Sequence, residues 1–320
     1  GLQTLALAAF ALGCGGNSEP IDCPQPADAF DVTNMEADIS YLASTELAGR
    51  APASPGDLAA RAYIVERFQT LGVEPGVDGA YEQPFVNEGG LDVANIVGVV
   101  RGKDANVADE VIVVGSHYDH FGLVDGKLYL GANDDASGVA GMLSVAQAVS
   151  ERGLRRTVAF VAFGSEEALT KPPWVEGSHY FVHNAPVDLS IDRTVYMVNL
   201  DMIGSYHDPE VVEVMGSFAN TPARDILDCS VQRYPNMNFD LGIPGSRGGS
   251  DFHPFCKEGV PYAFFWTDDY DCYHEPCDKA GRIDYAPAKK IVNVAIDLVI
   301  GLGDSEDDLL GDRKAIRCGN

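Results

Sequence analysis

Basic residues are scarce in this chain of 320 residues. Lysine and arginine together number 22 against 48 aspartates and glutamates, so the formal net charge is -26. Phosphate binding needs a basic surface, and the deficit therefore argues against nucleic acid as a partner. It argues in the same way against binding to an anionic membrane surface. No segment repeats at a fixed period.

A long apolar run is also missing near the start. Leu2–Leu12 is too short to span a bilayer and has the length of a signal-peptide core. Neither a Met nor a basic segment precedes it, so we expect a truncated signal. Ala11-Leu12-Gly13-Cys14 resembles a bacterial lipobox, in which a lipid on Cys14 would tether the protein to the cell envelope. A secretory signal is the alternative, and either one predicts an exported protein with residues 1–30 as signal and linker.

Cysteines are few, at seven. If Cys14 carries lipid, six remain, and an even number in an exported protein suggests up to three disulfides. Their irregular spacing does not resemble a structural zinc site. Cys272 and Cys277 flank His274 closely enough to close a small loop, and we predict that they pair.

Strands and helices alternate along most of the chain. The predicted helices are 57–73, 137–153, 221–234 and 286–303, with Ser137 as the expected cap of the second. The predicted strands are 94–102, 110–116, 156–164, 193–201 and 260–267. Several of these strands are apolar throughout, which is typical of a sheet covered by helices on both faces. We therefore expect an α/β protein with three layers: one domain over 31–305, an N-terminal arm over 31–75, and an acidic tail over 306–320.

Ionisable residues gather where predicted strands end. The strand-end residues are His117, Asp119, His120, Glu166, Glu167 and Asp201; Asp134 and Asp135 precede a helix, and His274 follows in a late loop. Ligands of such sheets bind outside the carboxyl ends of the strands. Clustered carboxylates repel one another unless a divalent cation lies among them. Imidazole with carboxylate suits zinc, and two ions that share one carboxylate would satisfy the ligand count.

Each of these residues alone has an ordinary explanation. Asn133-Asp134-Asp135 before a helix is usually a capping turn, and Glu166-Glu167 is usually a solvated pair. Their joint occurrence in one order at strand ends makes coincidence improbable. Glu166 is then free to take a proton from water while its neighbour Glu167 binds metal.

These motifs together resemble one family of enzymes. His117-x-Asp119, Gly131-Ala-Asn-Asp134-Asp135-Ala-Ser-Gly138, Glu166-Glu167, Asn199-Leu-Asp201 and His274-x-Pro276-x-Asp278 are similar in order and spacing to the secreted zinc aminopeptidases of peptidase family M28. The similarity covers about residues 36–300. It implies a three-layer α/β/α sandwich with a mixed, mostly parallel eight-stranded sheet, two zinc ions, and a peptide or protein N-terminus as substrate.

The resemblance also implies a role for each site residue. His117 and Asp201 would hold one zinc, Glu167 and His274 the other, and Asp134 would bridge them. Glu166 would act as general base and then general acid, and Asp119 would orient the His117 ring. The family further implies a cis peptide between Asp134 and Asp135. His120 has no ligand counterpart in the family and is assigned no role.

Some features depart from the family pattern and leave alternatives open. Phe252 stands where relatives often have His, Arg247 is a candidate for the oxyanion-stabilising group, and residues 168–174 form an insertion beside the site. A glutaminyl cyclase, with a similar fold and one working zinc, is the alternative enzyme. A non-catalytic binding protein on a peptidase scaffold would be expected to lack ligands, and all five positions are filled. Substrate preference and oligomeric state are left open.

Overall fold

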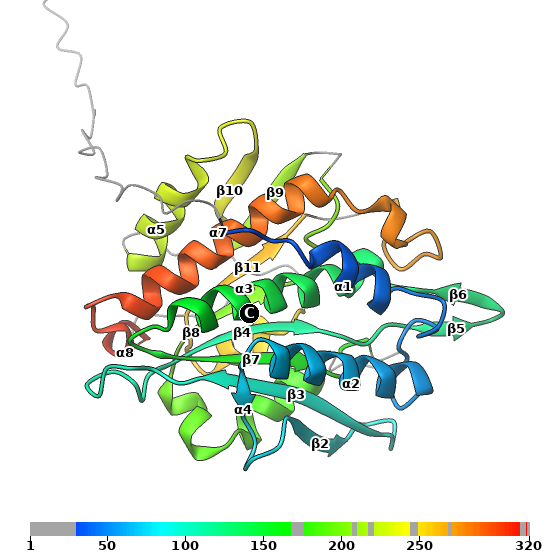
Figure 1. Ribbon diagram of the computed structural model, residues 1–320, viewed down its shortest axis with the longest axis horizontal. Helices are drawn as coiled ribbons and strands as arrows, with labels where there is room; N and C mark the ends of the chain where they lie inside the picture. The colour runs from blue at the N-terminus through cyan, green and yellow to red at the C-terminus, as the bar shows by residue number, and fades with distance from the viewer. Residues whose placement is uncertain are drawn as a thin grey trace, which may run out of the picture.

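A mixed β-sheet forms the centre of the protein in the computed structural model (Figure 1). The structure describes residues 30–167, 176–206, 210–216, 221–243, 249–267, 271–313 and 318. Within them the sheet has nine strands in the order β1-β3-β7-β4-β8-β11-β9-β10, with β2 also paired to β3. The strands are β1 (Glu74–Pro75), β2 (Glu82–Val86), β3 (Asp92–Val100), β4 (Val111–His117), β7 (Thr157–Phe163), β8 (Thr194–Leu200), β9 (Val211–Met215), β10 (Asn238–Ile243) and β11 (Tyr262–Trp266).

Parallel pairing is concentrated in the middle of the sheet. β4 pairs in parallel with β7 and β8, and β11 continues in parallel from β8. β1, β2 and β7 run antiparallel to β3, and β9 runs antiparallel to β11. The parallel centre brings the carboxyl ends of β4, β7 and β8 to one edge.

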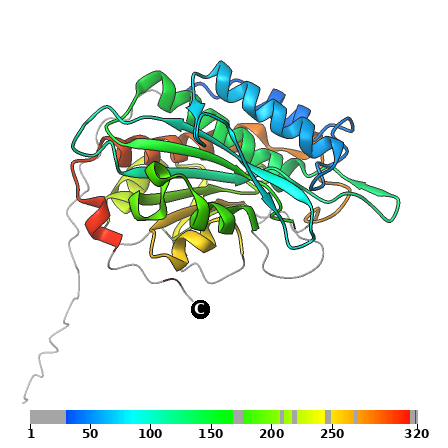
Figure 2. The same cartoon turned by 90° about the horizontal axis from the view of Figure 1, so that it is seen from below.

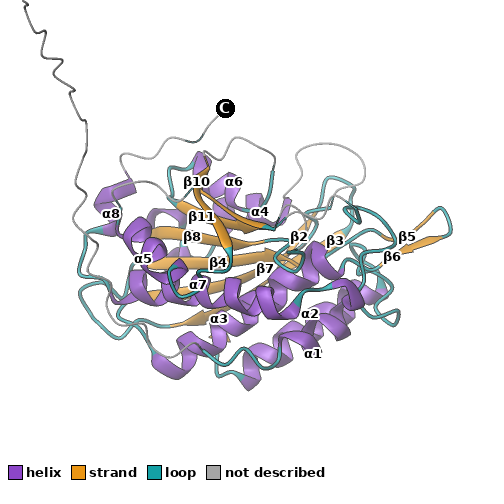
Figure 3. Ribbon diagram, turned by 90° about the horizontal axis from the view of Figure 1, so that it is seen from above, coloured by secondary structure: helices purple, strands orange, loops and turns teal. Residues whose placement is uncertain are grey.

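Helices cover both faces of the sheet, so the predicted three layers are confirmed (Figures 2 and 3). One face packs against α1 (Met35–Leu42), α2 (Pro55–Thr70), α3 (Gly138–Arg152), α5 (Pro222–Val231) and α7 (Tyr285–Asp304). The other packs against α4 (Glu176–Asn184) and α6 (Phe252–Lys257). Alternation along β4 serves both layers, because Ile112 and Val114 join the first core and Val111 and Val113 the second.

The predicted helices and strands all occur, with ends that differ by a few residues. The elements that were not predicted are α1, α4, α6, β1, β2, β9, β10, the short helix α8 (Leu309–Asp312), and the hairpin of β5 (Gly122–Val124) and β6 (Lys127–Tyr129). The hairpin extends away from the sheet (Figure 1). Among the described helices, none is long and apolar enough to cross a membrane.

Arg50 connects the N-terminal helices to the edge where the parallel strands end. Its side chain is fully buried, and it donates to the carbonyl oxygens of Leu42 at 2.6 Å, Tyr118 at 2.6 Å, Leu130 at 2.7 Å and Gly131 at 2.9 Å. Four charge-assisted hydrogen bonds compensate the burial of this cation. They also hold the main chain after β4 against the segment that precedes Asp134.

Two disulfides lie within the described residues. Cys272 pairs with Cys277, as predicted, and Cys256 of α6 pairs with Cys318. The second bond ties the C-terminal end of the chain to the α4 and α6 layer. Leu309 is buried, so the acidic C-terminal segment contributes an apolar contact to the core.

Candidate metal centre

Asp134 lies at the centre of the cluster, and its two carboxylate oxygens face different histidines. Oδ1 is 3.2 Å from Nε2 of His117, and Oδ2 is 3.2 Å from Nε2 of His274. Asp201 Oδ1 lies 3.6 Å from the same His117 nitrogen, and Glu167 Oε1 lies 3.2 Å from the His274 nitrogen. The five side chains therefore form two donor sets that share one carboxylate.

Three parallel strands place most of this cluster. His117 is the last residue of β4, Asp201 follows β8 directly, and Glu167 follows β7 after a short turn. His117 is in register with Phe163 of β7, and Gly115 with Asn199 of β8. Side chains from positions that are far apart in the sequence thus meet at one edge of the sheet.

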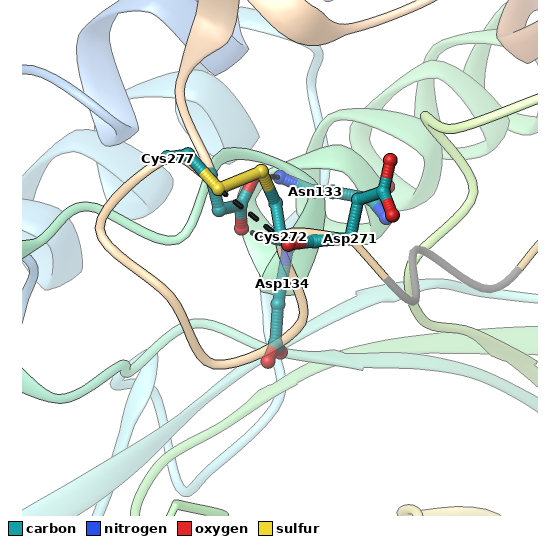
Figure 4. The surroundings of a disulfide bond; sticks show 6 residues. Asn133, Asp134, Asp271, Cys272 and Cys277 are labelled. Atoms are coloured by element: carbon teal, nitrogen blue, oxygen red, sulfur yellow. Dashed lines mark hydrogen bonds between the residues drawn. A yellow bond between two sulfur atoms is a disulfide. The ribbon is translucent and has the colours of Figure 1, made fainter.

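The loop that carries His274 is fastened to the segment that carries Asp134. Asp278 accepts hydrogen bonds from the backbone N–H of Asn133 at 2.7 Å and of Asp134 at 3.0 Å. The Cys272–Cys277 disulfide closes the same loop beside these residues (Figure 4). The Asp134–Asp135 peptide bond is cis, as the family resemblance implied. His274 and the Asp134 carboxylate are in this way held together from outside the sheet.

Asp135 lies near His117 and Asp201 and belongs to the same group of possible ligands. Its oxygens, however, already accept hydrogen bonds from Gly138 N at 2.8 Å, Met202 N at 3.1 Å and Ser116 Oγ at 2.6 Å. Asp135 rather than Ser137 therefore caps α3, because Ser137 makes no side-chain capping bond. Asp135 therefore holds the strand ends, whereas Asp134 faces the two histidines.

Gly138 makes that cap possible. A Cβ atom at this position would lie 2.5 Å from both Asp135 oxygens and 2.2 Å from the Leu200 carbonyl oxygen. Only glycine allows the first turn of α3 to approach the Asp135 carboxylate and the end of β8 this closely.

The contact of Asp119 differs from the one that the resemblance implied. Nδ1 of His117 lies 3.2 Å from the backbone carbonyl of Asp119, so the main chain rather than the carboxylate faces the ring. The carboxylate instead accepts from the backbone N–H of Glu166 at 3.0 Å and of Glu167 at 3.1 Å. Asp119 thereby fixes the turn on which the two glutamates diverge.

A serine hydroxyl orients Asp201. Ser250 Oγ donates to Asp201 Oδ2 at 2.7 Å and accepts from Asn199 Nδ2 at 3.1 Å. Oδ1 of Asp201 is left facing His117. This chain of contacts gives Ser250, in the variant Ser250-Asp251-Phe252 motif, a positioning role.

His120 belongs to the cluster, although the family resemblance assigned it no role. Its side chain is fully buried, and Nδ1 lies 3.2 Å from Glu167 Oε1 and 3.8 Å from Asp134 Oδ2. The available signal was its place at the tip of β4, one residue after Asp119. The structure therefore places His120 against two of the predicted site residues, Glu167 and Asp134.

The charges of the site are strongly perturbed. Burial raises the pKa of the Glu166 carboxyl well above its ordinary value, and Glu167, Asp251 and Asp201 add to the rise. Burial alone would lower the pKa of His117, but Glu166 and Asp201 outweigh it and raise that pKa. In His274, burial is outweighed by Asp134 and Glu167, which raise the pKa to about 10. Without a cation, the cluster compensates its carboxylates by holding protons.

These shifts predict opposite pH dependences for the metal-free and zinc-loaded protein. Burial raises the pKa of Asp119 and of Asp278 from 3.8 to about 6, so the folded form binds more protons than the unfolded form in that window. The stability that protonated Asp119 and Asp278 contribute is therefore lost as pH rises from 3.8 to about 6. The contribution of protonated His274 to folding stability is complete below pH 6.5 and is lost as pH rises toward 10. Zinc needs deprotonated ligands, so zinc stabilisation grows as pH rises.

Urea unfolding at about pH 5 and about pH 8 tests both signs. We expect the urea midpoint of the chelated protein to be lower at pH 8 than at pH 5. We expect the rise in midpoint on adding zinc to be larger at pH 8 than at pH 5. A chelated protein that becomes more stable at the higher pH would contradict the proton-holding description.

Unpartnered buried atoms test whether the residues suit a metal. Among the described residues, the buried atoms without a hydrogen-bond partner include Asp134 Oδ2, Glu167 Oε1, Asp201 Oδ1 and both ring nitrogens of His120. Buried polar atoms are normally satisfied, and these belong to residues that surround Asp134 in the two donor sets or lie beside them. Imidazole and carboxylate donors suit zinc. The site residues therefore fit the ion that the sequence predicted.

These observations define an α/β protein with a metal-binding site of carboxylates and imidazoles at the carboxyl edge of its sheet. Residues 95–299 match the model of peptidase family M28, and the chain belongs to that family. It is 28% identical over 298 residues to leupeptin-inactivating enzyme 1 of Streptomyces exfoliatus, a match that covers 82% of this chain and 59% of that protein. The chain thus spans less than two thirds of the length of this relative.

Solved structures share the fold. A zinc aminopeptidase from Bacillus subtilis superposes with a TM-score of 0.70 at 16% identity, covering 87% of this chain and 96% of the other. Porphyromonas gingivalis glutaminyl cyclase superposes with a TM-score of 0.70 at 17% identity, covering 85% of this chain and 99% of the other. The two superpositions show the fold of this chain but not its activity, because an aminopeptidase and a glutaminyl cyclase share that fold.

Several features named from the sequence lie outside the described residues. They are the apolar run Leu2–Leu12, the lipobox cysteine Cys14, Arg247, and the inserted segment at 168–174.

Proposed function

We propose that the protein is a di-zinc aminopeptidase that hydrolyses the N-terminal peptide bond of peptides or proteins. The observation that carries the proposal is the pair of donor sets on either side of Asp134, each with its own histidine and its own second carboxylate. Membership of peptidase family M28 supports the same reaction.

In this proposal His117 and Asp201 hold one zinc, Glu167 and His274 hold the other, and Asp134 bridges them. Zinc in such a site supplies a water of lowered pKa and positive charge toward the carbonyl oxygen. Glu166 accepts the proton from the attacking water and later delivers it to the leaving amine. The raised pKa of the Glu166 carboxyl suits a group that both accepts and returns a proton.

The chain's own contacts keep the two neighbouring glutamates in different roles. The Asp119 carboxylate holds both of their backbone N–H groups, so the turn that separates the side chains is fixed. Glu167 Oε1 is directed at His274. The charged groups that act on Glu166 include His117 and Asp201, and also Glu167 itself. The largest of these charge interactions is the one with His117, which supports a proton acceptor beside that donor set.

An assay of two substrate types tests the proposal. Purified zinc-loaded protein should release nitroaniline from an aminoacyl-nitroanilide and should leave an N-terminal glutaminyl peptide uncyclised. Cyclisation of the glutaminyl peptide without hydrolysis would instead establish the alternative enzyme class. Inactivity on a broad panel of both types would favour a binding protein on the peptidase scaffold.

We propose further that the protein is exported, with residues 1–30 as signal and linker, a single catalytic domain over 31–305 that includes the arm 31–75, and a tail over 306–320. Disulfides at Cys272–Cys277 and Cys256–Cys318 support an oxidising compartment. The lipobox-like sequence ending at Cys14 supports a lipid anchor. Mass spectrometry of the native N-terminus distinguishes a lipidated Cys14 from a cleaved secretory signal.

A further inference from the structure

The His120 ring lies beside one donor set and not beside the other. Its Nδ1 lies 3.2 Å from Glu167 Oε1 and 3.8 Å from Asp134 Oδ2. Those two oxygens also face His274 Nε2, each at 3.2 Å. The other donor set consists of His117, Asp201 and the second oxygen of Asp134.

The short contacts of His120 are not hydrogen bonds. Both of its ring nitrogens are buried and lack a hydrogen-bond partner, and so do Glu167 Oε1 and Asp134 Oδ2. Two buried polar atoms that approach to 3.2 Å without hydrogen-bond geometry are placed like ligands of a common ion. Leaving an imidazole buried without a partner is unfavourable, and a cation between these atoms would remove that cost.

The distances suit tetrahedral zinc. Ligand bonds of about 2.0–2.2 Å in a tetrahedron place neighbouring ligand atoms about 3.4 Å apart. The four contacts among His120, His274, Asp134 and Glu167 are 3.2, 3.2, 3.2 and 3.8 Å. Ligand-type atoms of His120, Asp134 and Glu167 all lie within 4.8 Å of one another.

The ring of His120 is held in this position. Gly131 has a φ of +62°, and a Cβ atom there would lie 2.5 Å from His120 Cγ. Phe121 stacks on the ring, with a centroid distance of 4.7 Å. Arg50 binds the carbonyl oxygens of Tyr118 and Gly131, which fixes the main chain on both sides of the ring. A ligand that is placed before the ion arrives loses little freedom on binding it.

We propose that His120 Nδ1 is a fourth protein ligand for the ion held by Asp134, Glu167 and His274. That site is then closed by four protein ligands, whereas the His117 site has three and keeps a position for water. The two sites are unequal: the closed site fills first, and the His117 site serves the reacting water beside Glu166. This inference rests on the metal binding proposed above but not on the identity of the substrate.

X-ray absorption at the zinc edge, on protein loaded with one zinc per chain, tests the proposal. We expect two imidazole ligands per zinc in the natural chain and one in His120→Asn, which keeps a polar group near the position of Nδ1. Competition with a chromophoric chelator should show the tighter site weakened by about 100-fold or more. His183→Asn, at an exposed position on α4, is the matched control and should bind zinc like the natural chain.

One imidazole per zinc in the natural chain, or two in the variant, would overturn the proposal. The count in the natural chain decides the question even if His120→Asn fails to fold. Hydrolysis of aminoacyl-nitroanilides is measured on the same samples. Two imidazoles per zinc without hydrolysis would support this ligand assignment and contradict the proposed function. One imidazole per zinc with hydrolysis would support the proposed function and contradict the ligand assignment.

Discussion

Glu166→Gln is expected to retain zinc and fold while turnover falls by about 10²–10⁴-fold. The amide preserves the shape of the side chain but cannot accept the proton of the attacking water. Glu167→Ala is expected to lose both activity and metal, because Glu167 Oε1 lies within 3.2 Å of His274 Nε2 and of His120 Nδ1. Kinetics with zinc analysis on both variants measures the contrast.

Three controls sharpen this comparison. Circular dichroism and the unfolding midpoint show whether each variant is folded. Glu66→Gln, at an exposed glutamate on α2, is expected to leave both turnover and zinc content unchanged. If Glu166→Gln and Glu167→Ala both kept metal and comparable activity, the division of roles between the neighbours would be wrong.

Removal of zinc is expected to abolish hydrolysis and to lower the stability of the protein. Close to two zinc ions per chain should be found by elemental analysis, since five side chains form two sets around Asp134. An ion present at about 100 times its dissociation constant stabilises the folded form by about 2.7 kcal/mol. Thermal unfolding with and without a chelator measures this change, and readdition of zinc should restore both properties.

Magnesium added back to the chelated protein is the matched control. The donor sets combine imidazole with carboxylate, whereas magnesium prefers oxygen ligands and octahedral geometry. Magnesium is therefore expected to restore little activity. Full hydrolysis by protein that holds no detectable metal would overturn the metal-dependent mechanism.

Local sequence was sufficient for the main elements of the fold. Uninterrupted apolar runs such as 111–114 and 158–163 predict strands buried on both faces, because a helix-covered sheet leaves no polar face on its central strands. The elements that were missed are short, polar or peripheral, such as β2 and β10. Their pairing is decided by the strand that lies beside them rather than by their own composition.

Sequence also predicted which side chains would meet at this edge of the sheet. Parallel strands end at one edge, so polar residues after apolar runs predict a shared site at His117, Glu167 and Asp201. His117 is the last residue of β4, and its Nε2 lies 3.2 Å from Asp134 Oδ1. Only the order of strands β7, β4 and β8 in the sheet determined that these tips are neighbours.

Tertiary structure decided how neighbouring residues divide their contacts. Asp135 caps α3 while Asp134 faces the histidines, and Asp119 uses its carboxylate for the Glu166 and Glu167 backbone. His120 enters the cluster because Gly131 leaves room for its ring and because Glu167 and Asp134 arrive from other elements. The sequence by itself predicted where the strands end and which ionisable residues follow them. The direction of each side chain depends on contacts between distant segments, and those exist only after the chain has folded.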